Sequence, residues 1–422
     1  MEITEKIKIA KTASLELLKL DSEERKKVLQ DLAQEIKIYE NEILSANKKD
    51  VENAIQNKIA KNLVNRLTLS AESIENMCEA IQVVANKNDV LYEIIEEIKR
   101  PSGITIKKQR FPLGLVAIIY ESRPNVTIDA FVMTFKSGNA VILKGGKEIV
   151  NTNKVLVNLV QNVLKKHNID LNVIQDFSGV SREDVGKMLV DKNIDCLIPR
   201  GGKGLIDFVV ENAKIPIIIT GASVVHAYVD ESASLEQAIK VIKNAKLRNT
   251  AICNALDVVL INKSVAEEFL SKFIQSVKND ELELLCDKDS LEIINLIHGG
   301  LGNLKVVPAS ADDFEKEFLS ARMAVKLVEN LDEAISYIQK HSLGHSEVIF
   351  TQNQKHAEKF FREVDSACVY QNTSTQFSDG GEFGMGGEIG ISTQKLHARG
   401  PFAYKELTTY KYVVISEGAI RK

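Results

Sequence analysis

The hydrophobic pattern of the chain changes character after about the first hundred residues. In residues 1–100, apolar positions recur at the three- and four-residue spacing of amphipathic helices, and Ser22 and Ser70 stand where helix N-caps are expected. Further along, short continuous apolar runs alternate with helical segments. Such runs are typical of strands that are buried on both faces of a parallel sheet. The pattern therefore predicts an N-terminal helical region followed by α/β structure.

A first group of strands is predicted before residue 220. The continuous apolar runs lie at 115–120, 140–143, 196–198 and 215–219. Helical segments such as 127–136 and 151–167 separate them, whereas residues 104–110 alternate as a half-exposed strand does. Repeated strand–turn–helix units of this kind predict a parallel α/β sheet.

The pattern restarts after Gly221 and predicts a second α/β unit. Its first elements are strands at 226–229 and 258–261 and helices at 234–244 and 265–277. A chain of 422 residues is long enough for two domains, and we expect their boundary between Gly221 and His226. Residues 408–415 form a strong predicted strand without a neighbouring partner, so we expect it to pair with a remote hairpin or another subunit.

Composition narrows the functional class. The net charge is −4, from 54 basic and 58 acidic residues, which argues against a nucleic-acid-binding protein. No apolar run reaches the ~18 residues of a membrane span, and the first twenty residues lack the pattern of a signal peptide. The five cysteines are scattered without a C-x-x-C pair, so we expect neither a disulfide framework nor a metal site. A cytoplasmic protein is expected.

Two glycine turns follow predicted buried strands and precede predicted helices. One is Lys144-Gly145-Gly146-Lys147 and the other is Arg200-Gly201-Gly202-Lys203-Gly204. Open α/β sheets bind ligands at this end of their strands, and helix N-termini attract phosphate. The turns therefore suit a dinucleotide, but neither matches G-x-G-x-x-G, and ordinary turns with solvated lysines explain the pattern about equally well.

Cys253 and Asn125 are open to two interpretations each. Cys253 lies among short neutral residues ahead of the strand at 258–261. It is either a nucleophile or a buried structural thiol, and the residues alone favour the thiol. Asn125 follows the strand at 115–120, where its amide could donate to a developing oxyanion or cap the next helix. Three other cysteines lie in predicted strands or helices, and we expect them to be core residues: Cys78, Cys196 and Cys368.

A glycine-rich segment lies near the C-terminus. Residues 377–393 contain six glycines in seventeen residues. Their aliphatic and aromatic neighbours argue against a free linker. The segment is therefore predicted to adopt backbone conformations that favour glycine or to lie against a ligand.

Ordered motifs along nearly the whole chain resemble the aldehyde dehydrogenase superfamily, and within it the reductases that act on glutamate 5-phosphate. The motifs are Y-E-S-R-P-N-V-T (120–127), I-P-R-G-G-K-G-L-I (198–206), H-A-Y-V-D-E-S-A (226–233), C-N-A (253–255), G-H-S-E (344–347), the glycine-rich run 379–401 and E-L-T-T-Y-K-Y (406–412). The resemblance implies an α/β, aldehyde dehydrogenase-like fold with a Rossmann-type cofactor domain, a second α/β catalytic domain and a small β oligomerisation element.

The resemblance also implies boundaries, a reaction and partners. The domains would be 1–100 and 124–225 for NADP binding, 226–397 for catalysis, and 101–123 with 398–422 for oligomerisation. The implied reaction is reduction of L-glutamate 5-phosphate by NADPH to the 5-semialdehyde, with release of phosphate, in proline biosynthesis. A homodimer or homotetramer and functional coupling to glutamate 5-kinase are further expectations.

Site residues carry over by motif position. The resemblance implies that Cys253 is the nucleophile and that Asn125 holds the oxyanion. The implied cofactor-binding residues are Lys144, Gly145, Gly146, Lys147, Arg200, Gly201, Gly202 and Glu317, with Lys144 and Glu317 at ribose hydroxyls and Lys147 at the 2′-phosphate of NADP. The implied substrate-binding residues are Glu121, Ser122, Arg123 and Arg248.

The sequence departs from the family pattern at three places. Ile219 stands where a glutamate is common, Asn249-Thr250 where arginine and proline are common, and Gln376 where arginine is usual. The loss of cations puts phosphate binding in question, and Arg248 is the residue that could compensate. Two alternatives therefore stay open: a CoA-acylating aldehyde dehydrogenase, and a catalytically impaired member that acts as a binding subunit.

Overall fold

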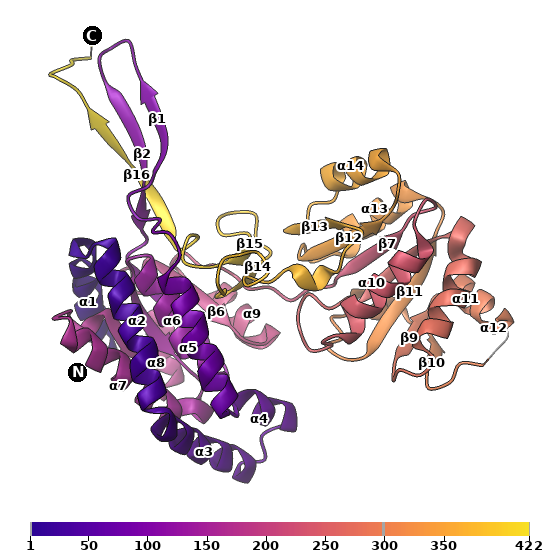
Figure 1. The fold of residues 1–422 in the computed structure, drawn as a ribbon, viewed down its shortest axis with the longest axis horizontal. Helices are drawn as coiled ribbons and strands as arrows, with labels where there is room; N and C mark the ends of the chain where they lie inside the picture. The colour runs from indigo at the N-terminus through magenta and orange to yellow at the C-terminus, as the bar shows by residue number, and fades with distance from the viewer. Residues whose placement is uncertain (1, 298–299, 422) are drawn as a thin grey trace. The chain divides into compact units, whose positions relative to one another are not determined.

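Two parallel sheets organise the chain, one in each of two units (Figure 1). The computed structural model describes residues 2–297 and 300–421. Unit 1 comprises Met1–Thr220, Gly384–Gly390 and Pro401–Lys422, and unit 2 comprises Gly221–Phe383 and Ile391–Gly400. The α/β fold predicted from the sequence is confirmed. The structure divides the chain at 220/221, whereas the sequence prediction divided it at 225/226.

The sheet of unit 1 has the strand order β5-β4-β3-β6, and every pairing is parallel. Its strands are β3 (Leu115–Tyr120), β4 (Ala140–Lys144), β5 (Ile174–Asp176) and β6 (Cys196–Arg200). The chain passes from β3 through β4 to β5 and then places β6 on the other side of β3. Ligands of open α/β sheets bind at the carboxyl ends of strands where the order reverses in this way. The reversal in unit 1 lies between β3 and β6.

Nine α-helices surround this sheet in the described part of unit 1. They are α1 (Ile3–Ser14), α2 (Ser22–Ile38), α3 (Glu40–Gln56), α4 (Lys61–Leu67), α5 (Ala71–Ala85), α6 (Asn125–Lys136), α7 (Val150–Lys166), α8 (Arg182–Met188) and α9 (Lys203–Asn212). Ser70 caps α5 as predicted, but Asp21, not Ser22, caps α2. A capping box needs its acceptor three residues before the partner Glu24, and Asp21 holds that position.

A three-stranded antiparallel ribbon also belongs to unit 1. Its strands are β1 (Ile94–Lys99), β2 (Thr105–Pro112) and β16 (Thr408–Ile415), in the order β1-β2-β16 (Figure 1). The C-terminal strand therefore finds its partner in the remote hairpin within the same chain. The predicted oligomerisation element included residues 115–120, but these residues form β3, a buried strand of the parallel sheet.

The sheet of unit 2 is entirely parallel, with the order β10-β9-β11-β8-β7-β12-β13. Its strands are β7 (His226–Val229), β8 (Val258–Asn262), β9 (Glu283–Cys286), β10 (Lys305–Pro308), β11 (Arg322–Val328), β12 (Ser346–Phe350) and β13 (Cys368–Gln371). The short strands β14 (Gly390–Ser392) and β15 (Gly400–Phe402) lie where the chain passes between the units.

Helices cover both faces of the unit 2 sheet. The helices are α10 (Leu235–Leu247), α11 (Ala266–Val277), α12 (Lys288–Leu296), α13 (Leu331–His341) and α14 (Gln354–Glu363). Helices α10, α11 and α12 pack in one hydrophobic cluster and α13 and α14 in another. Side chains of β7 alternate between the two clusters, as Ala227 and Tyr228 do, because successive strand residues face opposite sides.

The strand predicted at 215–219 does not form. Only one bridge, between Leu197 and Ile217, connects this segment to β6. Pro216 and Pro199 have no backbone N–H, so the ladder cannot extend beyond the bridge. Within residues 2–297 and 300–421, no helix is long and apolar enough to cross a bilayer.

Candidate active site

Cys253 lies in the turn between α10 and β8, at the amino-terminal edge of the unit 2 sheet. Ala255 N donates to Ile252 O (3.1 Å) across the turn, and Ser223 Oγ donates to the carbonyl oxygen of Cys253. Cys253 is half-buried, whereas the other four cysteines are buried. Of the five thiols, that of Cys253 is therefore the one most open to a substrate.

Ser223 also connects the cysteine turn to Glu317. Its Oγ lies 3.2 Å from Glu317 Oε1, to which it donates. Burial and the nearby carboxylate of Asp257 together raise the pKa of Glu317 to about 6. The resemblance assigned Cys253 to catalysis and Glu317 to the cofactor, and here the carbonyl oxygen of Cys253 and Glu317 Oε1 share the single hydrogen of the Ser223 hydroxyl.

The short helix η6 (Thr375–Phe377) holds the residue after the cysteine. Thr375 Oγ1 donates to Asn254 O (2.7 Å), and Asn254 Nδ2 donates to Ser378 O (3.0 Å). Thr375, Asn254 and Ser378 are all buried. The position of the cysteine turn is thus fixed by a segment more than one hundred residues away in the sequence.

Gln376 connects this segment to the end of α10. Its Nε2 donates to Ala245 O (2.7 Å) and Asn249 O (3.1 Å), and its Oε1 accepts from Arg248 Nε (2.7 Å). Gln376 is buried, whereas Arg248 is exposed and has no other side-chain partner in the described part of the chain. The buried amide therefore orients an exposed guanidinium close in sequence to Cys253.

A buried Lys246–Asp257 pair lies beneath the same turn. Lys246 Nζ is 3.8 Å from Asp257 Oδ1 and makes no hydrogen bond. Burial lowers the pKa of Lys246 to about 8 and raises that of Asp257 to about 6, while the mutual attraction of the pair opposes both shifts. Asp257 also accepts from Phe318 N (3.1 Å), next to Glu317. This pair was not predicted from the sequence, although Lys246 shares the apolar face of α10 with Ile242.

The predicted cofactor residues of unit 1 lie at the carboxyl ends of two strands. Lys144, Gly145, Gly146 and Lys147 are at the end of β4, and Arg200, Gly201 and Gly202 are at the end of β6, beside the strand-order reversal between β3 and β6. The carboxylate of Glu121, directly after β3, accepts from Gly202 N (3.0 Å) at the N-terminus of α9. A Cβ at Gly201 would lie 2.7 Å from Glu121 Cδ, so a side chain at this position would displace that carboxylate. Glu121 was predicted to bind substrate, and it lies instead among the residues predicted to bind cofactor. The contact demonstrates that this helix terminus accepts an anion.

Lys144 ends β4 and is half-buried. Burial lowers its pKa, and its ammonium donates only to the adjacent Gly145 O (3.0 Å) in the described residues. An ammonium group without a carboxylate partner suits the hydroxyls of a ribose. Together with the anion-accepting N-terminus of α9, it fits a nicotinamide dinucleotide.

The remaining predicted residues of this region have separate surroundings. Lys147 is exposed, and Gly146 lies against the Glu148 side chain. Ser122 is buried and donates through Oγ to Glu148 Oε1 (2.5 Å). Arg123 is exposed ahead of α6. Ser122 and Arg123, both predicted to bind substrate, thus have different environments.

Asn125 is the first residue of α6 and does not cap it, because Pro124 precedes the helix at the N-cap position. Its Nδ2 donates to Asp129 Oδ2 (3.0 Å), one turn further on. The start of α6 is fixed by a buried triangle of hydrogen bonds among Tyr120, Thr127 and Asn153. Asn125 is therefore exposed on a rigidly held helix N-terminus.

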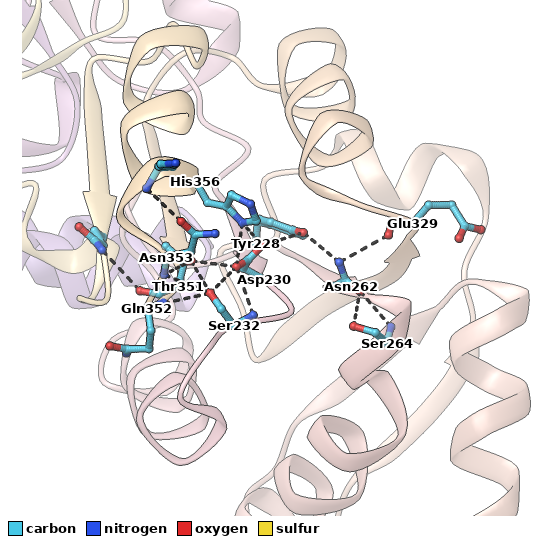
Figure 2. Close-up of polar contacts among 12 residues, drawn as sticks. Tyr228, Asp230, Ser232, Asn262, Ser264, Glu329, Thr351, Gln352, Asn353 and His356 are labelled. Atoms are coloured by element: carbon cyan, nitrogen blue, oxygen red, sulfur yellow. Dashed lines mark hydrogen bonds and ion pairs between the residues drawn. The ribbon is translucent and has the colours of Figure 1, made fainter.

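The carboxyl edge of the unit 2 sheet carries a polar cluster that the sequence analysis did not single out (Figure 2). Asp230, directly after β7, accepts from Ser232 Oγ (2.6 Å), Thr351 Oγ1 (2.8 Å) and His356 Nδ1 (3.0 Å). The strand order of this sheet reverses between β7 and β12, where a ligand crevice is expected. Here the protein's own side chains saturate the carboxylate, so the cluster connects β7, β12 and α14.

Comparisons with known proteins agree with this architecture. The model of the aldehyde dehydrogenase family matches residues 1–289 and 304–413. A gamma-glutamyl phosphate reductase of Francisella philomiragia is 43% identical over 422 residues and covers 100% of both chains. The crystal structure of the Thermotoga maritima gamma-glutamyl phosphate reductase superposes with a TM-score of 0.95 at 40% identity, again covering 100% of both chains.

The chain belongs to the aldehyde dehydrogenase family, and it is an oxidoreductase. Within that family it belongs with the gamma-glutamyl phosphate reductases. Family membership implies a nicotinamide cofactor. An engineered glycolyl-CoA reductase with bound NADP⁺ shares the fold at 16% identity, with a TM-score of 0.70, over 99% of this chain and 97% of that one.

Proposed function

We propose that the protein reduces L-glutamate 5-phosphate to L-glutamate 5-semialdehyde, with NADPH as reductant and release of phosphate, in proline biosynthesis. The relatives named above support the reaction. The observation that carries the proposal is Cys253, the one half-buried thiol of five, in a turn fixed by Ser223 and Thr375.

The Cys253 thiolate attacks the acyl-phosphate carbonyl, the carbon–oxygen bond to phosphate breaks, and a thioester forms on the sulfur. Asn125 donates its amide hydrogen to the developing oxyanion. Bound NADPH supplies the hydride that reduces the thioester. The resulting thiohemiacetal then expels the Cys253 thiolate and releases the aldehyde. Phosphate and thiolate are both good leaving groups, so neither needs strong acid assistance. Because the thioester is reduced and not hydrolysed, no water needs activation, and Ile219 can stand where other family members have a carboxylate.

Arg248 would bind the phosphate of the substrate, and its guanidinium is oriented by Gln376. An arginine fork suits the oxygens of phosphate. Arg248 would therefore replace the cations that the sequence lacks at positions 249 and 376. Arg123, exposed ahead of α6, is a second cation for the substrate.

For NADPH, Lys144 and Glu317 would bind ribose hydroxyls. The glycine turn of Arg200, Gly201 and Gly202 would receive the pyrophosphate at the N-terminus of α9, in place of the Glu121 carboxylate that accepts from Gly202 N. The turn of Gly145 and Gly146 would admit the adenosine half, and the exposed Lys147 would meet the 2′-phosphate.

Assembly belongs to the same proposal. The β1-β2-β16 ribbon exposes apolar side chains, including Ile95, Tyr412 and Val414. Exposed apolar strands favour pairing with another chain. We propose a homodimer or homotetramer that acts in the cytoplasm and is functionally coupled to glutamate 5-kinase.

The choice of acyl acceptor tests the reaction. The full-length protein is supplied with glutamate 5-semialdehyde and NADP⁺, and NADPH formation is followed with phosphate, with CoA or with neither. Turnover that requires phosphate is the expected result. Turnover that requires CoA would instead identify a CoA-acylating aldehyde dehydrogenase, and NADP⁺ binding without turnover would identify a catalytically impaired binding subunit.

A further inference from the structure

Unit 1 contains a pocket of about 450 Å³ beside Asn125. It is bounded by α5, by α6, by the end of α4 and by the glycine-rich loop at 386–388. Its volume lies in the range of small-molecule sites. Its lining combines apolar side chains of α5 and α6 with three charged residues, Arg66, Asp129 and Glu388. The pocket lining thus holds one cationic and two anionic groups among apolar and neutral polar side chains.

The glycine loop forms a fixed wall of this pocket. Gly386 and Gly387 have φ values of +87° and +150°, which side-chain-bearing residues rarely adopt. A Cβ at Gly386 would lie 3.0 Å from Val83 Cγ1, and one at Gly387 would lie 3.0 Å from Met133 Cε. The loop backbone therefore packs closely on α5 and α6, and the pocket keeps its shape.

Asp129 provides an anionic group one helical turn from Asn125. Its Oδ2 accepts from Asn125 Nδ2, and no other side chain in the described residues donates to it. Burial raises its pKa to about 6, against the hydrogen bond from Asn125 and the charge of Arg200. A half-buried carboxylate with an oxygen left unbonded suits an ammonium ligand.

Arg66 provides the cationic group at another part of the pocket. It lies in the last turn of α4 and is exposed. Its guanidinium makes no hydrogen bond or ion pair with the described residues, unlike Arg25 or Arg110, which pair with carboxylates. A guanidinium without a partner suits a carboxylate ligand, which it can bind through two parallel hydrogen bonds.

We propose that this pocket recognises the amino-acid head of the substrate: Asp129, with Glu388, binds the α-ammonium group and Arg66 binds the α-carboxylate. The assignment rests on the proposed function, in which Asn125 binds the oxygen of the reacting carbonyl. Asn125 then binds the reacting carbonyl, Asp129, which is hydrogen-bonded to Asn125, binds the ammonium group together with Glu388, and Arg66 binds the carboxylate. A site with charged groups of this kind discriminates strongly against an analogue that lacks the matching group.

Three aldehydes separate the two contacts. Glutamate 5-semialdehyde carries both head groups, 5-oxopentanoate lacks the amino group, and 4-aminobutanal lacks the carboxylate. Phosphate-dependent NADP⁺ reduction is measured with each aldehyde for the wild type, Asp129→Asn and Arg66→Gln. Lys61→Gln is the matched control, because Lys61 is exposed on the same helix as Arg66 and does not line the pocket.

The expected results follow from the loss of one charged hydrogen bond, about 10- to 100-fold. Asp129→Asn should lower kcat/KM by that factor for the two amino aldehydes, relative to its effect on 5-oxopentanoate. Arg66→Gln should lower kcat/KM by the same factor for glutamate 5-semialdehyde and 5-oxopentanoate, which carry the carboxylate, relative to its effect on 4-aminobutanal. Equal losses for all three aldehydes would overturn the assignment, since they would assign Asp129 only a role in orienting Asn125.

A binding measurement tests the pocket assignment separately from the proposed reaction. Calorimetry compares L-glutamate with glutarate, which lacks the amino group, on the wild type and both pocket variants. Preference for L-glutamate that disappears in Asp129→Asn supports the pocket even if phosphate-dependent turnover is absent. If the wild type turns over glutamate 5-semialdehyde but binds L-glutamate and glutarate equally well, the pocket assignment would be wrong and the proposed reaction would still be supported.

Discussion

Replacing Gln376 by alanine tests whether a buried amide holds both the cysteine turn and the proposed phosphate-binding arginine. Gln376 is 4% exposed, and its side chain makes three hydrogen bonds, to Ala245 O, Asn249 O and Arg248 Nε. Ala245 O keeps a second bond from Leu256 N (3.0 Å), so the truncation leaves no buried carbonyl without a partner. At about 1 kcal/mol for each hydrogen bond, we expect a local destabilisation of about 2–3 kcal/mol.

Hydrogen exchange in residues 245–256 measures this destabilisation locally, because a two-unit chain need not unfold in one transition. A loss of about 2 kcal/mol should speed exchange of the Leu256 amide by about 30-fold. Gln339→Ala is the matched control: its exposed amide donates to one backbone carbonyl, that of Glu363, and its removal should leave residues 245–256 unchanged.

Replacing Gln376 by alanine should also change the KM for phosphate. Without Gln376, Arg248 must be ordered when phosphate binds, which for one side chain amounts to about 0.5–1.5 kcal/mol. The KM for phosphate should therefore rise about 2- to 10-fold while kcat changes less. Gln376→Glu should raise it further, because the new carboxylate pairs with the guanidinium and neutralises it. Unchanged exchange together with an unchanged KM for phosphate would refute the reasoning.

Two further predictions concern stability and cofactor binding. Asp230→Asn should destabilise unit 2 by about 1–3 kcal/mol at neutral pH, because it weakens the bonds from Ser232, Thr351 and His356. Burial acts to raise the pKa of Asp230, but these hydrogen bonds outweigh it and hold the pKa below its usual value. The stabilisation is therefore present above the unfolded pKa of about 3.9 and is lost as the pH falls through the folded value, so wild type and variant should converge in unfolding measurements at acid pH. Lys144→Met should weaken NADPH binding about 10-fold, measured by fluorescence titration. The unfolding midpoint should not change, because among the described residues the Lys144 ammonium bonds only to its neighbour Gly145. An affinity equal to that of the wild type would exclude Lys144 from the cofactor site.

The strands were the most predictable part of the fold. The runs at 115–120, 226–229 and 408–415 match β3, β7 and β16 residue for residue. Continuous apolar runs indicate burial in β3 and β7, whereas β16 is mostly exposed and was indicated by its β-branched and aromatic residues. The segment 215–219 was apolar enough to suggest a strand, but its proline removes the N–H that a ladder requires. Ile215 and Ile218 are buried, as the apolar composition of the segment suggests, but the segment does not form the predicted strand.

The candidate site was predictable only where a motif carried it. Cys253 and Glu317 were placed by resemblance, and the structure shows both bonded to Ser223. Ser223 itself, and the contact between Gln376 and the end of α10, depend on packing between segments that are distant in the sequence. Periodicity cannot reveal such contacts, although it does place Lys246 on the buried face of α10.

The most direct test of the central claim compares cysteines. Phosphate-dependent reduction of NADP⁺ by glutamate 5-semialdehyde is measured for the wild type, for Cys253→Ala and for Cys78→Ala, which removes a buried thiol of α5. The account predicts a loss of at least about 10³-fold in kcat for Cys253→Ala with NADP⁺ binding retained, and near-normal turnover for Cys78→Ala. Turnover by Cys253→Ala within a few-fold of the wild type would contradict it.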